Sequence, residues 1–318
     1  MKKLLFVLST VVILSSLTLS SCGDDDHTSW DGGGENINVL DEITDPEFKT
    51  RIKTAMSKGS IKTASPDWLT PQEAAVVERL DSYSWGLTDI KGIEYFTGLT
   101  YLDVSKNKIS SLDLSRNTKL ETLRCNANNL TSLNLNSNTE LKKLDCWDNK
   151  IESLDLSKCV KLEQLDVNRN NLKTLDVSKN TALTFIDCNE CNISGALNVS
   201  KNTKLLVLRC SENYTISKIN LPPSLTTLYC VLNSLTELEL HKCPDLQFVM
   251  CTRNPKMPEL DISKNRKLKK IQCGNVSTEP QITLYVWWEV PTTGWMWSTV
   301  PDGMTVGVGS AGVMKTKK

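Results

Sequence analysis

Cysteine is the residue type in this chain with the clearest capacity for chemistry. Cys188 and Cys191 form a Cys-x-x-Cys pair, a spacing that zinc and redox sites use. A second such pair is absent from the sequence, and the chain holds two histidines, His27 and His241. A zinc site needs about four ligands of this kind. We therefore predict no metal site and no cofactor.

Acid–base and nucleophilic catalysis have equally little support. His27 lies in an acidic, glycine-rich stretch and His241 more than 200 residues away, so no Ser-His-Asp or Cys-His arrangement is indicated. A carboxylate pair can act without histidine, as in glycosidases. The clustered carboxylates of this chain, however, recur at fixed intervals that we expect on an open surface. We predict that the protein is not an enzyme.

The interval is most evident in three aspartates, Asp145, Asp166 and Asp187, which follow one another every 21 residues. Leucines recur with nearly the same spacing, so the residues that could bind a partner must be carried by a repeating structural unit. The leucines that mark the starts of successive units are Leu99, Leu120, Leu141, Leu162, Leu183, Leu205, Leu225, Leu246 and Leu268.

Each unit reads L-x-x-L-x-[CV]-x-x-N-x-[LI], followed by a half of the form L-[DN]-[LV]-[SN]-x-N. This pattern resembles the leucine-rich-repeat family. The resemblance implies a repeat solenoid with a parallel β-sheet on one face, short extended or 3₁₀ segments on the other, a small helical N-cap and a β C-cap. We expect about nine units over residues 99–275.

Alternation within the unit supports the strand. In the second unit Leu123 and Cys125 would point inward while Thr122 and Arg124 face solvent, which is the period of two that marks a strand. The recurring asparagines would satisfy backbone groups of adjacent coils where the chain leaves the strand. They are Asn107, Asn128, Asn149, Asn170, Asn213, Asn233 and Asn254.

Seven cysteines share the inward position that follows the second leucine, namely Cys125, Cys146, Cys188, Cys210, Cys230, Cys251 and Cys273. An exported protein with many thiols suggests disulfides. The Cβ vectors of in-register neighbours run parallel, however, and Val104 and Val167 fill the same position in other units. We therefore favour buried free thiols over disulfides.

The first 40 residues predict export and anchoring. Lys2 and Lys3 precede an apolar run, so residues 1–21 are predicted to be a signal peptide. Leu19-Ser20-Ser21-Cys22 resembles a bacterial lipobox, which implies cleavage before Cys22, acylation of this cysteine (palmitate) and attachment to the membrane. An acidic, glycine-rich tether over 22–40 resembles that of surface-exposed lipoproteins of gut Gram-negative bacteria. This implies an outer-membrane lipoprotein facing the extracellular side. An ordinary signal peptide or a periplasm-facing protein is the alternative.

The segments on either side of the repeats are predicted to be caps. Residues 41–98 would be helical, with one helix starting at Asp45-Pro46 and another at Thr70-Pro71. They resemble the N-cap of bacterial leucine-rich-repeat surface proteins. The stretch 57–63 lacks the carboxylates that calcium requires, so no calcium site is expected.

Residues 276–318 are predicted to form a β C-cap, with the alternating stretch 282–288 in a hairpin that plugs the solenoid. This segment contains a tryptophan cluster, which the hairpin would bury at the solenoid end. The alternatives are an aromatic platform for sugar rings and an edge for self-assembly. The four residues are Trp287, Trp288, Trp295 and Trp297.

The outward positions of the strands form columns that predict where a partner would bind. One column includes the three aspartates, which are either balanced by Arg124, Arg209 and solvent or meant for a basic partner. Apolar residues gather towards the C-terminal half and indicate a protein-binding surface, unless neighbours cover them. The predicted partner-binding residues are Trp147, Asp145, Asp166, Asp187, Phe185, Val207, Tyr229, Val231, Phe248 and Met250.

The overall charge narrows the class of partner. Thirty-seven lysines and arginines balance 37 aspartates and glutamates, so nucleic acid is not expected. We predict a non-catalytic cell-surface binding protein that uses the strand face for protein–protein interaction or adhesion. The alternative is a glycan-binding accessory lipoprotein that uses the tryptophan cluster.

Overall fold

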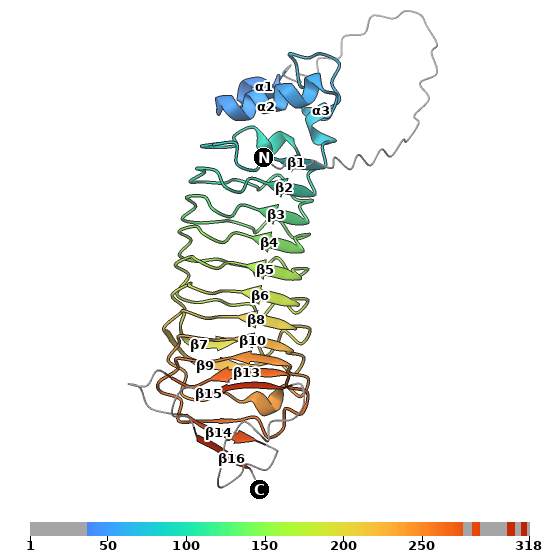
Figure 1. Ribbon diagram of the computed structural model, residues 1–318. Coiled ribbons are helices and arrows are strands. Elements are labelled where there is room, and N and C mark those ends of the chain that lie inside the picture. Colours follow the sequence, from blue (N-terminus) through green and yellow to red (C-terminus); the bar gives the residue numbers. More distant parts are fainter. Residues whose placement is uncertain (1–36, 276–281, 287–303, 309–312, 317–318) are drawn as a thin grey trace, which may run out of the picture. The chain divides into compact units, whose positions relative to one another are not determined.

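The computed structural model describes residues 37–275, 282–286, 304–308 and 313–316. Short parallel strands follow one another along a solenoid, and each coil contributes one strand to the main sheet (Figure 1). The eleven strands of the main sheet are, in spatial order, β1 (Arg79–Asp81), β2 (Tyr101–Asp103), β3 (Thr122–Arg124), β4 (Lys143–Asp145), β5 (Gln164–Asp166), β6 (Phe185–Asp187), β8 (Val207–Arg209), β10 (Thr227–Tyr229), β11 (Phe248–Met250), β13 (Lys270–Cys273) and β15 (Thr305–Val308).

Most strands of the main sheet are three residues long and place one buried side chain between two outward ones. In β3 the central Leu123 is fully buried, whereas Thr122 and Arg124 are half-exposed. Cys125, the next inward residue, is also fully buried. Leu102, Leu123 and their equivalents stand directly opposite one another in adjacent strands. The predicted parallel-sheet solenoid of about nine leucine-rich turns is confirmed.

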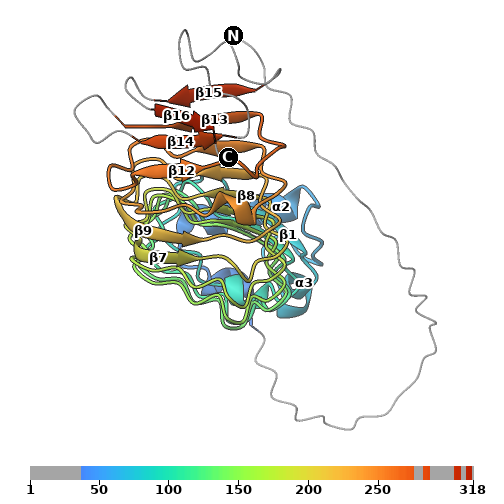
Figure 2. The same cartoon turned by 90° about the horizontal axis from the view of Figure 1, so that it is seen from below.

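The opposite wall holds isolated extended and 3₁₀ segments, as the lack of helical periodicity predicted. Strands β7 (Ser194–Asn198) and β9 (Thr215–Asn220) form a two-stranded parallel sheet there. In the view along the stack they lie across the solenoid from β1 and β8 (Figure 2). A 3₁₀ turn, η2 (Leu240–Lys242), lies further along this wall.

One column of asparagines joins successive coils at the end of each strand. The Asn149 side-chain amide donates to the carbonyl oxygens of Cys125 (3.0 Å) and Cys146 (3.1 Å), and its oxygen accepts from the Leu130 N–H (3.0 Å). Asn149 thus satisfies three backbone groups, two of them in the preceding coil. Buried polar groups need such partners, so this column fixes the coil spacing.

A second asparagine column runs along the opposite wall and works differently. Asn138 donates to the carbonyl oxygens of Leu114 (3.1 Å) and Asn117 (3.0 Å), but its own buried oxygen has no hydrogen-bond partner among the described residues. In this column only the N–H donors of the side-chain amide form hydrogen bonds. A thiol can therefore replace the amide, as Cys159 and Cys243 do.

From β1 to β13, each coil leaves the strand through a residue in the left-handed region. These residues precede the first asparagine column, and most of them are not glycine. Their φ values lie between 51° and 59° at Lys106, Ala127, Asp148, Arg169, Glu190, Glu212, Leu232 and Arg253. The turn is thus built at some backbone cost in each coil.

The N-terminal region contains the two helices whose starts were predicted. Asp45 caps α2 (Pro46–Ser57), and Thr70 and Glu73 form a capping box on α3 (Pro71–Ala75). A further helix, α1 (Val39–Glu42), begins inside the predicted tether, which is therefore wrong for its last residues. Asn38 caps α1 and also accepts from the Leu69 N–H, so tertiary packing supports this short helix.

The predicted helical N-cap, residues 41–98, also contains a strand between the helices and the first repeat. Strand β1 pairs with β2 in register, and only the 3₁₀ turn η1 (Ile93–Tyr95) is helical there. This segment is a coil of the solenoid. The repeat pattern is weak in this segment because Ser82 holds the inward position and Trp85 replaces the asparagine.

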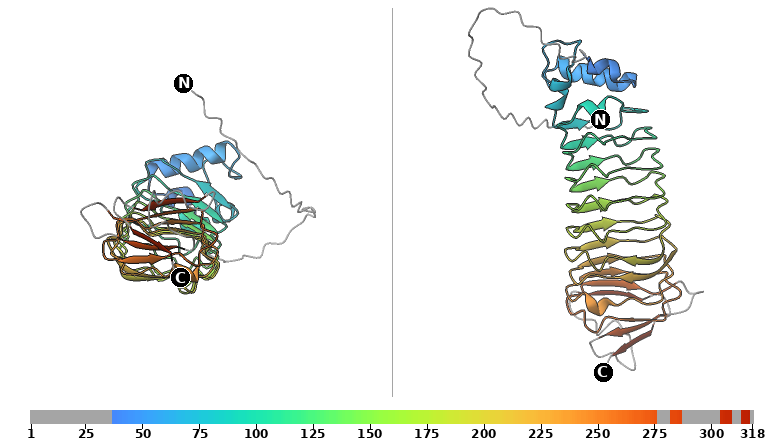
Figure 3. Two further views of the ribbon diagram at one scale, coloured as in Figure 1. Left: turned by 60° about the horizontal axis from the view of Figure 1, so that its bottom comes forward. Right: turned by 180° about the vertical axis from the view of Figure 1, so that it is seen from behind.

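The predicted C-terminal hairpin is also wrong. Strand β14 (Thr283–Val286) pairs in parallel with β12 (Glu259–Asp261) and with β16 (Val313–Thr316), and β15 pairs in parallel with β13. The C-terminal strands, coloured orange to red, continue both walls (Figure 3). Alternation predicted the strand β14 but not its partner. None of the helices among the described residues is long and apolar enough to cross a membrane.

Candidate protein-binding surface

The strand face carries two outward columns in the register that the sequence predicted. Each outward residue stands opposite its equivalent in the next coil, as Asp145, Asp166 and Asp187 do. The middle column is Asp103, Arg124, Asp145, Asp166, Asp187, Arg209, Tyr229, Met250 and Gln272; the adjacent column is Tyr101, Thr122, Lys143, Gln164, Phe185, Val207, Thr227, Phe248 and Lys270.

Basic residues of the chain balance most of the aspartates in the middle column. Arg124 lies between Asp103 and Asp145, with nitrogen–oxygen distances of 3.8 and 3.2 Å. Lys143 reaches Asp145 from the same strand at 3.6 Å. Arg209 pairs with Asp187 at 3.4 Å. Of the three stacked aspartates, Asp145 and Asp187 are therefore relieved by Arg124 and Arg209 as the sequence suggested.

Asp166 is different. No lysine or arginine in the described part of the chain forms an ion pair with it. Its carboxylate accepts hydrogen bonds from the backbone N–H of Asn168 (3.3 Å) and from the Asn168 side chain. Burial, and after it the nearby Asp187 carboxylate, raise the pKa of Asp166 to about 6. Burial also raises the pKa of Asp187.

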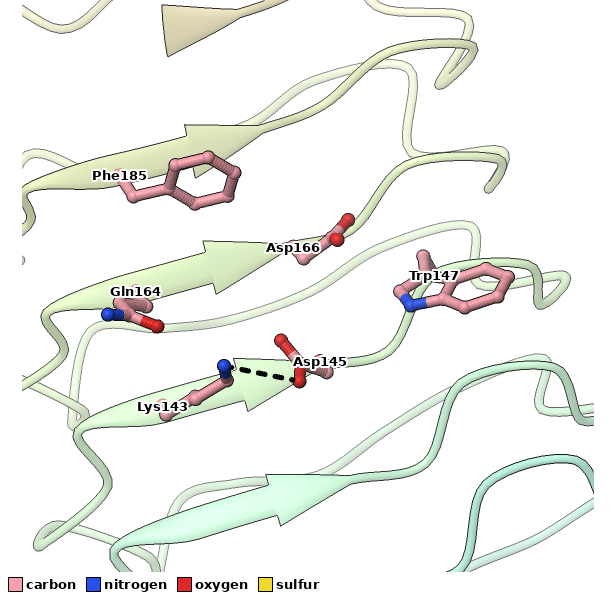
Figure 4. A pocket seen from close by; sticks show the side chains of 6 residues that line it. All are labelled: Lys143, Asp145, Trp147, Gln164, Asp166 and Phe185. Carbon is pink, nitrogen blue, oxygen red and sulfur yellow. Dashed lines mark ion pairs between the residues drawn. The ribbon is translucent and has the colours of Figure 1, made fainter. Parts of the chain in front are cut away.

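A shallow depression of about 340 Å³ surrounds Asp166, and we call it the Asp166 hollow. In Figure 4 Asp166 lies between Phe185 on β6 and Trp147 just beyond the end of β4, while Lys143 points to Asp145. The hollow combines carboxylates with aromatic rings from three consecutive coils. Its lining residues are Lys143, Asp145, Trp147, Gln164, Asp166 and Phe185.

Apolar side chains cluster on the same face towards the C-terminal half. Phe248 is 38% exposed, and the other members are half-buried. Arg209 lies 5.6 Å from the ring centroid of Phe185 and 5.7 Å from that of Tyr229. We call this set the apolar patch: Phe185, Val207, Tyr229, Val231, Phe248 and Met250.

The structure groups the predicted site residues and adds three. The hollow contains four of them, Trp147, Asp145, Asp166 and Phe185, while Asp187 is 5% exposed and held by Arg209. Reasoning from the sequence omitted Lys143 and Gln164, which share the column of Phe185, and Leu206, which is 45% exposed beside Val207. The column register could have revealed the first two.

Several predicted sites cannot be placed. Cys22 and the four tryptophans Trp287, Trp288, Trp295 and Trp297 lie outside the described residues.

The ten cysteines of the described region are free and buried. Burial raises the pKa of Cys191 to about 12, and those of Cys230 and Cys273 to about 12 as well. Such thiols are poor nucleophiles and poor metal ligands at neutral pH. Within the described residues, no group of three or more His, Cys, Asp or Glu side chains is arranged to hold a metal ion.

Comparison with known sequences agrees with the repeat. Residues 139–180 match the family model described as leucine-rich repeats (2 copies). A segment of 85 residues is 32% identical to Internalin J of Listeria monocytogenes serotype 4b. This match covers 27% of the chain and 9% of the length of Internalin J.

Solved structures show the same fold. The functional domain of InlJ from Listeria monocytogenes, described as including a cysteine ladder, has a TM-score of 0.51 at 24% identity and covers 88% of this chain and 72% of its own. The internalin InlF of the same species has a TM-score of 0.53 at 16% identity, with 88% and 99% covered. The leucine-rich effector YopM from Yersinia pestis has a TM-score of 0.52 at 21% identity, with 82% and 70% covered. The chain is a leucine-rich-repeat solenoid similar to the internalins.

Proposed function

We propose that this chain is a non-catalytic binding protein that holds a partner protein on its strand face. The observation that carries the proposal is the apolar patch, in which six side chains from four successive coils lie on one face. Leucine-rich-repeat solenoids typically serve protein–protein interaction. Phe185, Tyr229 and Phe248 add the aromatic side chains that enrich protein interfaces.

Packing of the solenoid does not need these side chains to be apolar. The core beneath them is formed by Ile186, Leu208, Leu228 and Val249, each fully buried. The equivalent outward positions in the N-terminal half hold Thr122, Lys143 and Gln164 among others. The change from polar to apolar at these positions therefore favours a contact surface.

Capture of a partner by purified protein tests this proposal. Wild type and a Tyr229→Ala, Phe248→Ala, Met250→Ala variant would be immobilised and exposed to solubilised surface proteins, with bound proteins identified by mass spectrometry. We expect a specific partner to be lost from the triple variant. A Val160→Ala, Tyr214→Ala variant removes large apolar side chains that are exposed outside the strand face, and it should retain the partner. Equal capture by all three folded proteins would contradict the proposal.

We also propose that the protein is a cell-surface lipoprotein with an acyl anchor at Cys22, which the lipobox-like residues Leu19-Ser20-Ser21-Cys22 support. The solenoid would then be displayed on the outer side of the outer membrane. Mass spectrometry of the mature N-terminal peptide should show acylation at Cys22. Protease treatment of intact cells should then remove the solenoid. A Cys22→Ser variant, which cannot be acylated at this position, should leave the membrane fraction. An unacylated mature N-terminus, or full protection from protease, would count against this localisation.

A further inference from the structure

At three places on the strand face a carboxylate lies near an aromatic ring. At two of them an arginine of the chain pairs with the carboxylate and lies over the ring. Arg209 pairs with the Asp187 carboxylate and lies over the ring of Tyr229. At the N-terminal end, Arg79 pairs with Asp81 at 3.8 Å and lies 3.5 Å from the ring centroid of Tyr101.

The Asp166 hollow is the third instance. It contains a carboxylate between two aromatic rings, those of Trp147 and Phe185, but no lysine or arginine of the described residues pairs with that carboxylate. Nearby cations are already engaged, because Arg124 and Lys143 hold Asp145 and Arg209 holds Asp187. One negative charge on this part of the face therefore remains uncompensated.

We propose that the Asp166 hollow receives a basic side chain, an arginine or a lysine, from the partner protein whose apolar side chains cover the apolar patch. This inference rests on the proposed function and specifies the chemistry of the partner. The guanidinium or ammonium pairs with Asp166 and lies against Trp147, and the depression of about 340 Å³ has room for one such side chain.

The sheet fixes the separation of the two contacts. From β5, which carries Asp166, to β10, which carries Tyr229, there are three steps through β6 and β8. At about 4.8 Å per step this is roughly 14 Å, which an extended peptide covers in about four residues. The partner segment thus carries a basic residue and, about four positions away, a large apolar one.

Short peptides test the proposal directly. The probes are acetyl-Arg-Ser-Gly-Ser-Phe-amide and the same peptide with citrulline, which has the shape of arginine without its charge. Binding is followed by ¹⁹F NMR of the protein labelled with 5-fluorotryptophan, and the Trp147 signal is assigned with a Trp147→Phe variant. We expect the arginine peptide to shift the Trp147 signal and to bind wild type about tenfold more tightly than the citrulline peptide.

Variants of the hollow separate charge recognition from a structural effect. Asp166→Asn should abolish the preference for arginine over citrulline, whereas Glu152→Gln, which removes an exposed charge outside the strand face, should keep it. Lys143→Gln removes a positive charge from the lining of the hollow and should tighten binding of the arginine peptide. Equal affinity of both peptides for wild type, or no binding of either, would overturn the proposal.

Acidity provides a further readout. Affinity for the arginine peptide should rise between pH 5 and 7, because Asp166 must lose its proton to pair with the guanidinium and its pKa is raised to about 6. The charged groups that face it are Asp145 and Lys143 on β4 and Asp187 on β6, with Arg124 and Arg209 one coil further out. Asp166→Asn should flatten this profile.

Failure here differs from failure of the proposed function. If the triple variant of the apolar patch loses its captured partner while the peptides show no preference for charge, the strand face binds protein but the Asp166 hollow does not select a cation. If capture is unaffected by the triple variant, the proposed function itself is wrong.

Discussion

Asp166 shows how one side chain can oppose folding in the free protein. An ionised carboxylate that is partly buried between Asp145 and Asp187 is less stable than one in water, so its pKa is raised from 3.8 to about 6. The folded state therefore binds a proton between these values that the unfolded state does not. The contribution of this group to stability is fully present below pH 4 and is lost as the pH rises through 6.

Replacing this carboxylate should stabilise the protein at neutral pH. We expect Asp166→Asn to raise the free energy of unfolding at pH 7 by about 1 to 2 kcal/mol, after allowance for solvent screening. The gain should shrink as the pH falls from 6 to 4. Urea unfolding of both proteins at several pH values measures the difference. Asp145→Asn, which takes a partner from Arg124 and Lys143, should destabilise instead; a gain for both variants would contradict this account.

Cys191 departs from the first asparagine column and predicts a stabilising substitution. Its sulfur lies 3.1 Å from the Val167 carbonyl oxygen but is a poor acceptor for the Leu172 N–H, which the equivalent asparagine oxygen would serve. Cys191→Asn should therefore stabilise by about 1 kcal/mol. The reverse change at an intact position, Asn149→Cys, should cost about 1 to 3 kcal/mol. Thermal unfolding compares the two; destabilisation by Cys191→Asn would show that packing outweighs the hydrogen bonds.

The turn that follows each main-sheet strand from β1 to β13 contains a residue whose positive φ costs conformational free energy. Ala127 has a φ of 53°, a conformation that an L-residue adopts at a cost and glycine adopts freely. We expect Ala127→Gly to stabilise by about 0.5 kcal/mol, because this relief exceeds the entropy that glycine adds to the unfolded chain. Ala196→Gly, at an exposed position in β7, should instead destabilise by about 0.5 to 1 kcal/mol. Denaturant midpoints test the pair, and a loss of stability in both would refute the idea.

Elements with a strict pattern were predictable from the sequence, and elements that depart from it were not. Leucine spacing and period-two alternation gave the register of both outward columns, so Asp166 could be placed beside Asp187, and Phe185 in the adjacent column, in advance. Strand β1 was missed because Ser82 and Trp85 break the pattern. Pairing of β14 was mistaken because alternation is the same in parallel and antiparallel strands. The hollow itself depends on rotamers, which spacing does not specify.

At the scale of the whole solenoid, each coil contacts mainly its neighbours, so opening should begin at the ends. The buried thiols report this. We expect iodoacetamide at pH 8 to leave the core cysteines almost unmodified in the native protein, because burial and raised pKa values both suppress the thiolate. In moderate urea, Cys273 near the C-terminal end should be alkylated before Cys188 in the middle. Mass spectrometry resolves each site, and simultaneous alkylation would indicate a single cooperative unit.

The in-register pairing of the main sheet also governs how the binding surface can change. Insertion of one whole coil between β6 and β8 would preserve the pattern of buried leucine and asparagine contacts, while part of a coil would turn inward side chains outward. The separation between Asp166 and Tyr229 is therefore adjustable only in increments of about 4.8 Å. Duplication of a single unit at this point would therefore suit a partner whose basic and apolar residues lie further apart, while Asp166 and Tyr229 themselves stay unchanged.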